Sequence, residues 1–151
     1  MALFATGRSV QIRLDGDLGP ATSIQCGLPQ GSPVSLILFM LYLAPLFRVG
    51  RPRSRFGYAD DVALLAISPS LATNSQALSA SLQEALTWGS GEGITFDPDK
   101  SELLHFSRRR TDQDPTSNPS VTAGPIKVCE NTDRPYLRWL GILFDRKLIF
   151  K

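Results

Sequence analysis

The stretch RFGYADDVALLA, residues 55–66, places two adjacent carboxylates, Asp60 and Asp61, between two apolar runs. Aromatic residues alternate with others before the pair, and the apolar run 62–66 follows it, so we predict two short strands that meet in a tight turn. Neighbouring like charges repel, and an unpaired carboxylate is costly to bury. The pair therefore lies either in an ordinary exposed turn or at a site where something positive binds.

A rigid hairpin with two carboxylates at its tip suits Mg²⁺, which takes oxygen ligands and keeps positions for water and phosphate. Two such ions about 3.5–4 Å apart stabilise the attacking and the leaving oxygen of a phosphoryl transfer. An Asp-Asp dipeptide alone is weak support for this chemistry, because an ordinary polar turn has the same composition.

The composition predicts one globular domain with an uneven distribution of charge. The 151 residues are 42% hydrophobic and 20% charged, with a net charge of +2, which suits a single soluble domain with a core. No Asp or Glu lies between Asp17 and Asp60, whereas arginines gather at the end of this span and again later: Arg48, Arg51, Arg53, Arg55 and Arg108–Arg110. Such runs suit a polyanion such as nucleic acid, and a solvated basic loop explains them equally well.

Neither a disulfide scaffold nor a membrane span is predicted. Cys26 and Cys129 are too few and too far apart for a disulfide framework or a zinc site, so we expect free thiols in a reducing compartment. The first ten residues lack the features of a signal peptide. The apolar run 34–47 is shorter than the roughly 18–20 residues of a membrane span and predicts a buried helix instead.

The first third of the chain predicts a hairpin, a shaped loop and a helix. Alternation over residues 10–14 and the Asp15-Gly16 turn indicate a β-hairpin whose return strand includes Ile24. Two glycines and two prolines shape the loop GLPQGSPVS, residues 27–35.

An apolar helix is predicted to follow this loop. Ser32 is its expected cap and Pro33 fits its first turn. Residues 36–43 are apolar nearly all round, so we expect this helix to lie inside the domain and to end or kink at Pro45.

The remainder predicts one more helix and several strands. Ser68-Pro69 resembles a helix start, helical spacing of leucines follows, and Gly89 is the expected end. Residues 93–110 predict strand, turn and strand, with the turn at 97–99. Residues 108–125 are polar and proline-rich and predict a flexible loop within the domain. Final strands are expected at about 126–128 and 137–144. The order of elements favours an α+β fold over a doubly wound sheet.

The loop GLPQGSPVS before an apolar helix, followed by the hairpin YADD, resembles the core of a reverse transcriptase, in particular the type carried by non-LTR (LINE-like) retrotransposons. The resemblance continues through GITFDPDKSELLHF, similar to the segment of the family's palm lysine, and LRWLGILFDRKL, similar to the Leu-Gly hairpin that follows the palm. These ordered segments cover about residues 7–148. They imply a partial palm, in which an antiparallel sheet with the catalytic hairpin packs on two helices.

The resemblance implies a role for each motif. Asp60 and Asp61 match the metal-binding carboxylates, and Lys100 matches the palm lysine proposed to donate a proton to departing pyrophosphate; these three form the implied catalytic set. Contacts to nucleotide and template are implied for Tyr58, Pro29, Gln30, Gly31 and Ser32. Primer support is implied for Trp139, Leu140 and Gly141. From the basic run we add phosphate contacts by Arg51, Arg53 and Arg55.

Plainer interpretations stay open for several of these residues. Tyr58 could pack against the sheet, Lys100 could be a solvated turn residue, and Trp139 could belong to the core. His105, the only histidine, has no partner cysteines in its strand-like run, so a packing or surface role is expected rather than metal binding.

One carboxylate of the family's catalytic centre is not matched. The family supplies it from an apolar strand upstream of the Gly-Pro-Gln loop, but only Asp15 and Asp17 precede that loop here, in a Gly-rich turn. FATGRSVQIRL resembles the connector after that strand, so we expect residues 1–151 to form a partial reverse transcriptase domain without the upstream catalytic strand, fingers or thumb. Two carboxylates without the third do not hold both ions in working geometry, so we expect the isolated chain to be inactive or nearly so.

The expected function is RNA-templated DNA synthesis by a two-metal mechanism. The implied cofactor is Mg²⁺, with Mn²⁺ as a substitute, and the implied partners are an RNA template, a DNA primer, dNTP and the rest of a retrotransposon polyprotein, without a membrane. We expect an intracellular location and favour the nucleus, although the residues do not determine it. The alternatives are a non-catalytic nucleic-acid-binding remnant or a decayed fragment; a two-metal nuclease would not need the GLPQGSP loop.

Overall fold

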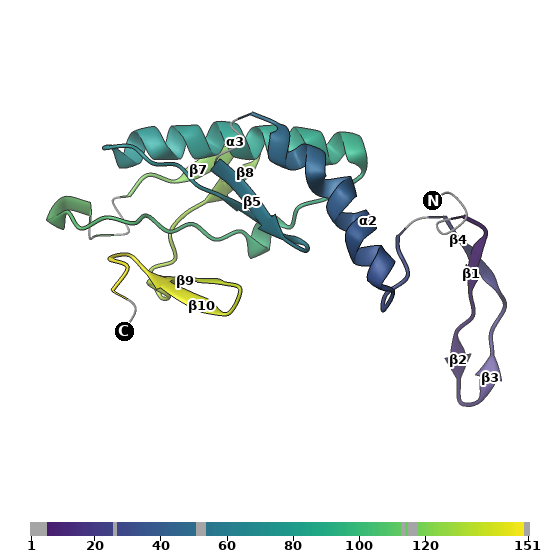
Figure 1. The fold of residues 1–151 in the computed structure, drawn as a ribbon. Coiled ribbons are helices and arrows are strands. Elements are labelled where there is room, and N and C mark those ends of the chain that lie inside the picture. Colours follow the sequence, from purple (N-terminus) through teal and green to yellow (C-terminus); the bar gives the residue numbers. More distant parts are fainter. Residues whose placement is uncertain (1–5, 26, 51–53, 113, 115–117, 150–151) are drawn as a thin grey trace. The chain divides into compact units, whose positions relative to one another are not determined.

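The computed structural model describes residues 6–25, 27–50, 54–112, 114 and 118–149 (Figure 1). The chain divides into two compact units, Met1–Ala44 and Pro45–Lys151. Each unit has its own elements, and each contains part of the predicted site.

The first unit contains the predicted N-terminal hairpin. Its strands are β1 (Arg8–Val10), β2 (Arg13–Leu14), β3 (Asp17–Leu18) and β4 (Thr22–Ile24). β1 pairs antiparallel with β4, and β2 with β3. Asp15 has φ 49° and Gly16 has φ 95°, and two consecutive positive φ values fit the type I′ turn that the Asp-Gly pair predicts.

Helix α2 (Pro33–Leu43) begins after Ser32, with Pro33 in its first turn as predicted. It continues into the 3₁₀ helix η1 (Ala44–Arg48). The prediction that α2 lies in the interior is wrong for most of its length: Leu36 is 58% exposed and Ile37 60%, and only Leu43 is buried. The strands of the same unit are two or three residues long and largely exposed. Most of their large apolar side chains are exposed as well, so they do not cover the helix.

The second unit is built around helix α3 (Leu71–Glu92) and the hairpin of β5 (Arg55–Tyr58) and β6 (Asp61–Leu64). The Ser70 hydroxyl accepts a hydrogen bond from the Thr73 amide and caps α3. The helix therefore begins two residues later than the Ser68-Pro69 start that we predicted, because Ser68 bonds Ser70 in a local turn instead.

The predicted end of α3 at Gly89 is also wrong, since the helix continues to Glu92 and is capped by Gly93 with φ 73°. Gly89 is buried inside the helix, where the chain that follows α3 packs against it. A Cβ on Gly89 would lie 2.8 Å from the Phe96 ring and 2.9 Å from the Ile94 carbonyl oxygen. Glycine thus permits the close return of the chain after α3.

The hairpin of β7 (Val121–Ala123) and β8 (Ile126–Val128) lies along α3 (Figure 1). Val121 and Ala123 are buried, and the Thr122 amide donates to the Ser79 hydroxyl at 2.9 Å. The prediction of a flexible loop over 108–125 is therefore wrong for its last residues, and its early part contains the 3₁₀ helix η4 (Arg110–Asp112). The segment is mostly polar, but the apolar residues of β7, Val121 and Ala123, are buried where the strand contacts α3.

The strands predicted within 93–110 do not form in the described residues. This segment contains the 3₁₀ helix η3 (Pro98–Lys100), and its β-type pairing is a single bridge between Leu103 and Glu130. The Asp97 carboxylate accepts from the Asp99 amide and stabilises the helical turn in place of a simple strand connection.

The predicted strand 137–144 is instead a hairpin of β9 (Tyr136–Trp139) and β10 (Ile142–Asp145). Its turn contains Leu140 with φ 49° and Gly141 with φ 84°. A hairpin at this Leu-Gly pair is the feature that the family resemblance predicts.

Across the described ranges, ten short strands form five two-stranded antiparallel sheets, accompanied by two α-helices. This confirms the mixed α+β class. The one continuous antiparallel sheet that we expected is not formed by these residues. Within the same ranges, neither helix has the length and apolar character needed to cross a membrane.

Candidate nucleotidyl-transfer site

Asp60 and Asp61 lie at the tip of the β5–β6 hairpin, and both are exposed. The two-residue turn contains Ala59 with φ 51° and Asp60. An alanine in the left-handed region is uncommon, and such conformations gather at functional sites. The turn directs neighbouring carboxylates into solvent at the end of a paired element.

The hairpin has one exposed face and one packed face. Directly opposite residues of an antiparallel pair share a face, and the register pairs Tyr58 with Asp61 and Phe56 with Ala63. Tyr58 is 64% exposed, so it does not pack against a sheet in the manner of the plainer interpretation. An aromatic ring and a carboxylate therefore project together from the exposed face.

The packed face carries Arg55 and Gly57. A Cβ on Gly57 would lie 2.6 Å from the Phe47 ring, so the absence of a side chain lets Phe47 approach the hairpin backbone. Arg55 is only 4% exposed and donates to the carbonyl oxygens of Leu46 at 2.7 Å and Ser81 at 2.8 Å. These contacts fix the hairpin to η1 and α3.

Arg55 is therefore an internal cross-link and offers little surface to a phosphate. Its remaining bonds reach the Val49 carbonyl, the Ser81 hydroxyl and, at 3.4 Å, the Glu84 carboxylate. Arg51 and Arg53, the other phosphate contacts predicted with it, lie outside the described residues.

The β9–β10 hairpin, for which primer support was predicted, contacts the acidic hairpin through one pair of aromatic rings. The rings of Phe56 and Trp139 meet edge to face, with centroids 6.4 Å apart and an interplanar angle of 84°. Trp139 is half-buried, whereas Leu140 at the turn is 51% exposed. Within the second unit, the structure thus brings together two of the segments that the sequence assigned to one site.

Lys100 lies in η3, with its side chain 84% exposed, and forms an ion pair with Asp97 at 3.5 Å. In the described part of the chain no hydrogen bond or ion pair joins it to Asp60 or Asp61. The solvated-turn interpretation of Lys100 agrees with this geometry, and a catalytic role stays a prediction.

The Gly-Pro-Gln loop belongs to the first unit. The Ser35 hydroxyl donates to the Pro29 carbonyl at 2.6 Å, and Gly31 has φ 85°. Gln30 and Gly31 are exposed, while Pro29 and Ser32 are half-buried. The loop is a defined turn before α2, which leaves Gln30 accessible to a ligand.

The paired carboxylates do not form a complete metal cage within the described ranges. No group of three or more His, Cys, Asp or Glu side chains that could hold a metal is found there. Asp60 and Asp61 supply the hard oxygen atoms that Mg²⁺ prefers, but only as a pair.

A buried polar network that sequence reasoning missed surrounds Glu130. Its carboxylate accepts from the His105 amide at 2.6 Å, from Asn118 at 2.6 Å and from Arg146 at 3.2 Å. The His105 ring nitrogen Nε2 lies 2.8 Å from the Pro119 carbonyl oxygen, which is the packing role expected for the histidine. The network joins the end of β10 to the loops before β7.

Asp112 belongs to the edge of this network. Hydrogen bonds from the hydroxyls of Ser107, at 2.6 Å, and Thr111, at 2.9 Å, lower the pKa of Asp112, with smaller contributions from the charges of Arg109 and Arg146. The carboxylate is thereby held in its charged form.

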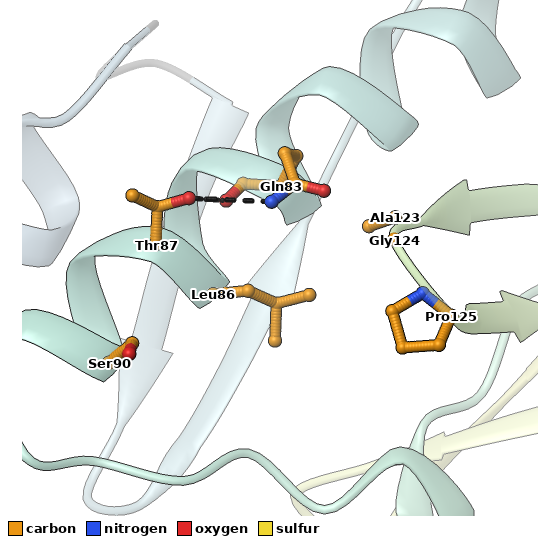
Figure 2. A pocket seen from close by; sticks show the side chains of 7 residues that line it. All are labelled: Gln83, Leu86, Thr87, Ser90, Ala123, Gly124 and Pro125. Atoms are coloured by element: carbon orange, nitrogen blue, oxygen red, sulfur yellow. Dashed lines mark hydrogen bonds between the residues drawn. The ribbon is translucent and has the colours of Figure 1, made fainter.

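Two hollows lie on the second unit. The first, of 370 Å³, lies between α3 and the β7–β8 turn, and its lining contains no charged side chain (Figure 2): Gln83, Leu86, Thr87, Ser90, Ala123, Gly124 and Pro125. Thr87 donates to the Gln83 carbonyl at 2.8 Å, so its hydroxyl is already engaged. The second, of 490 Å³, is lined by Glu102, Arg134, Tyr136, Arg138, Gly141 and Leu143.

Comparison with known proteins gives one finding. A family model for reverse transcriptase (RNA-dependent DNA polymerase) matches residues 4–144, which is most of the chain. The chain therefore belongs to the reverse transcriptase family. No curated protein and no solved structure matches it. The family expected from the sequence is confirmed, and RNA-directed DNA polymerase is the activity of that family.

Proposed function

We propose that this chain carries the paired metal-binding carboxylates of a retrotransposon reverse transcriptase of the non-LTR type. Membership of the family supports template-directed nucleotidyl transfer as the reaction. The observation that carries the proposal is the geometry of the β5–β6 hairpin. Arg55 fixes its packed side to the unit, and its tip exposes Asp60, Asp61 and Tyr58 together.

The two carboxylates are the type of ligand that a divalent cation prefers, but two are too few for a complete site. Asp60 and Asp61 would ligate Mg²⁺ or Mn²⁺ together with water and the triphosphate oxygens of dNTP. When bound, the ions would neutralise charge on the attacking and leaving oxygens. Because the described residues supply no third ligand to this pair, we propose that these 151 residues are a partial palm that is inactive, or nearly so, alone.

Other residues would position the nucleic acids around this pair. Tyr58 shares a face with Asp61 and would contact the incoming nucleotide. Gln30 on its exposed loop would contact the template strand, and the exposed turn at Leu140 would support the primer, held by the contact of Trp139 with Phe56. Lys100 would donate a proton to pyrophosphate, which requires it to leave Asp97.

Primer extension tests this function directly. The purified chain is incubated with a labelled DNA primer on an RNA template, four dNTPs and Mg²⁺. We expect no extension above that of the double variant Asp60→Asn/Asp61→Asn. Asp15→Asn/Asp17→Asn serves as the matched control, because these carboxylates flank the tip of another exposed hairpin.

Two outcomes would contradict the proposal. Clear extension that the Asp60→Asn/Asp61→Asn variant loses and the control retains would show that two carboxylates suffice. Extension that survives in that double variant would show that the hairpin is not the catalytic centre.

A further inference from the structure

A row of alternating side chains leads into the β9–β10 hairpin and continues on the face of β9 opposite Trp139. Arg134, Tyr136 and Arg138 occupy every second position, Arg134 just before β9 and the other two within it, and all three are exposed. Within β9 this spacing keeps side chains on one face. The register pairs Arg138 with Leu143 and Tyr136 with Asp145, whereas Trp139 pairs with Ile142 on the other face. This row is distinct from the implied primer support at Trp139, Leu140 and Gly141.

The row lines the hollow of 490 Å³, a volume within the usual range of about 300–1,000 Å³ for sites that bind small organic groups. In the described part of the chain, the ion pairs are Arg55–Glu84, Lys100–Asp97 and Arg146–Glu130. The guanidinium groups of Arg134 and Arg138 thus form no ion pair there. Along the chain, the two arginines flank Tyr136, which is 44% exposed.

Two carboxylates lie near this row, and they differ in how far other groups already occupy their oxygen atoms. Asp145 shares a face with Tyr136, but its oxygens accept from the amides of Lys147 at 3.3 Å and Ile149 at 2.7 Å. Glu102 is exposed and lines the hollow. Glu102 is therefore the acidic group that would oppose an anionic ligand.

We propose that this hollow binds an unpaired strand of nucleic acid, with one base stacked on Tyr136 and phosphates held by Arg134 and Arg138. The strand rise of about 3.3 Å per residue places Tyr136 and Arg138 roughly 7 Å apart along the hairpin. An aromatic ring between cations matches a strand whose bases are free to stack, whereas a duplex hides its base faces. This proposal rests on the proposed function in one respect, namely that the polyanion bound here is nucleic acid.

Equilibrium binding of a labelled 12-nucleotide single strand, as DNA and as RNA, tests this site between 50 and 200 mM salt on the full chain. We expect Arg138→Gln to weaken binding and to lower the slope of log affinity against log salt by about 0.7, the value for one phosphate contact on a single strand. Tyr136→Leu should weaken binding about fivefold or more, with an unchanged slope, because it removes stacking and no charge.

Two variants separate this site from general effects of charge and folding. Lys127→Gln removes an exposed cation from β8 of the same unit and should change the affinity less than Arg138→Gln. Glu102→Gln should tighten binding, a gain that loss of folding cannot produce. Equal losses in Lys127→Gln and Arg138→Gln, or an unchanged affinity in Tyr136→Leu, would overturn the proposal.

Competitors decide the class of ligand. A duplex of the same length that binds as tightly as the single strand, or a polyglutamate peptide that displaces it equally well, would also overturn the proposal. Because the site needs neither metal nor the acidic hairpin, the chain should bind the single strand in EDTA as tightly as in Mg²⁺ at matched ionic strength. The binding assay therefore tests this site separately from the primer-extension assay, which tests the proposed function.

Discussion

The guanidinium of Arg55 bonds three backbone carbonyls, the hydroxyl of Ser81 and the carboxylate of Glu84, while its own side chain is only 1% exposed. From the sequence, Arg55 is one of several clustered arginines and looks like a phosphate ligand. Burial of a cation is tolerated only where acceptors surround it. Tertiary packing supplies these acceptors from segments up to 29 residues away, which no local pattern reveals.

Replacing Arg55 by Ala should therefore lower the free energy of unfolding by about 2 kcal/mol or more, because buried carbonyl oxygens lose their donor. Little of this loss is assigned to Glu84, whose side chain is 45% exposed and well screened. Urea denaturation followed by circular dichroism measures the change. Arg48→Ala, at an exposed position, is the control and should change stability by less than about 0.5 kcal/mol. Equal effects of both variants would refute the cross-link.

The lowered pKa of a second residue, Asp112, leads us to expect that stability depends on pH. Its pKa is lowered in the folded chain, first by the Ser107 hydroxyl and then by Thr111. A carboxylate with a lowered pKa stabilises the fold above its unfolded pKa, and this stabilisation is lost as the pH falls through the folded pKa. The melting temperature of the wild type should therefore fall more steeply in acid than that of Asp112→Asn. Parallel curves for the two proteins would contradict the role of these hydrogen bonds.

Helix α3 shows at the scale of an element how packing overrides local signals. Gly89 looks like a helix terminator in the sequence, yet it lies inside α3 because Phe96 returns against it. Gly91 lies in the same helix and is exposed, and a Cβ there would meet nothing within 4 Å. The two glycines make a matched pair for mutation.

We expect Gly89→Ala to destabilise the chain by about 1–3 kcal/mol, since the new methyl group overlaps the Phe96 ring and a backbone oxygen. Gly91→Ala should instead stabilise it by up to about 1 kcal/mol, because alanine favours a helix where space is free. Thermal and urea unfolding of both variants measure the difference. A stabilising Gly89→Ala would contradict the close packing of Phe96 against Gly89.

Turn chemistry made some elements predictable, and long-range packing made others unpredictable. The Asp15-Gly16 turn and the start of α2 at Ser32-Pro33 follow from residues that prefer these conformations. The hairpin around Asp60 follows from the strand pattern on both sides of its turn, since Ala59 does not favour its positive φ. Strand β7 was hidden in a polar segment, because only Val121 and Ala123 mark its contact with α3. The exposure of α2 was missed, because an apolar sequence states a preference for burial but does not provide the surface that covers it.

The candidate site divides in the same way. Asp60, Asp61 and the loop around Gln30 were found from ordered motifs, and within the second unit the contact of Phe56 with Trp139 joins the acidic hairpin to the β9–β10 hairpin. The row of Arg134, Tyr136 and Arg138 was not singled out. Its period of two is visible in the sequence, but its meaning depends on the register of β9 with β10.

At the scale of the whole molecule, the match to the reverse transcriptase family extends over both compact units. The loop before α2 belongs to one unit, and the β5–β6 and β9–β10 hairpins belong to the other. A polymerase site needs charged groups held in advance where charge develops. The described residues provide two carboxylates on a firmly anchored hairpin, and this pair is the central feature of the proposed function.

Nucleotide-dependent binding of Mn²⁺ tests this feature most directly, because it requires no turnover. In NMR spectra of the labelled chain with dTTP, Mn²⁺ should broaden the amide signals around Asp60 and Asp61 before those around Asp15 and Asp17, the matched acidic hairpin. Asp60→Asn/Asp61→Asn should abolish this broadening, while Asp15→Asn/Asp17→Asn should leave it intact. Equal broadening at both hairpins, or broadening at residues 58–61 that persists in Asp60→Asn/Asp61→Asn, would contradict a metal site at the hairpin tip.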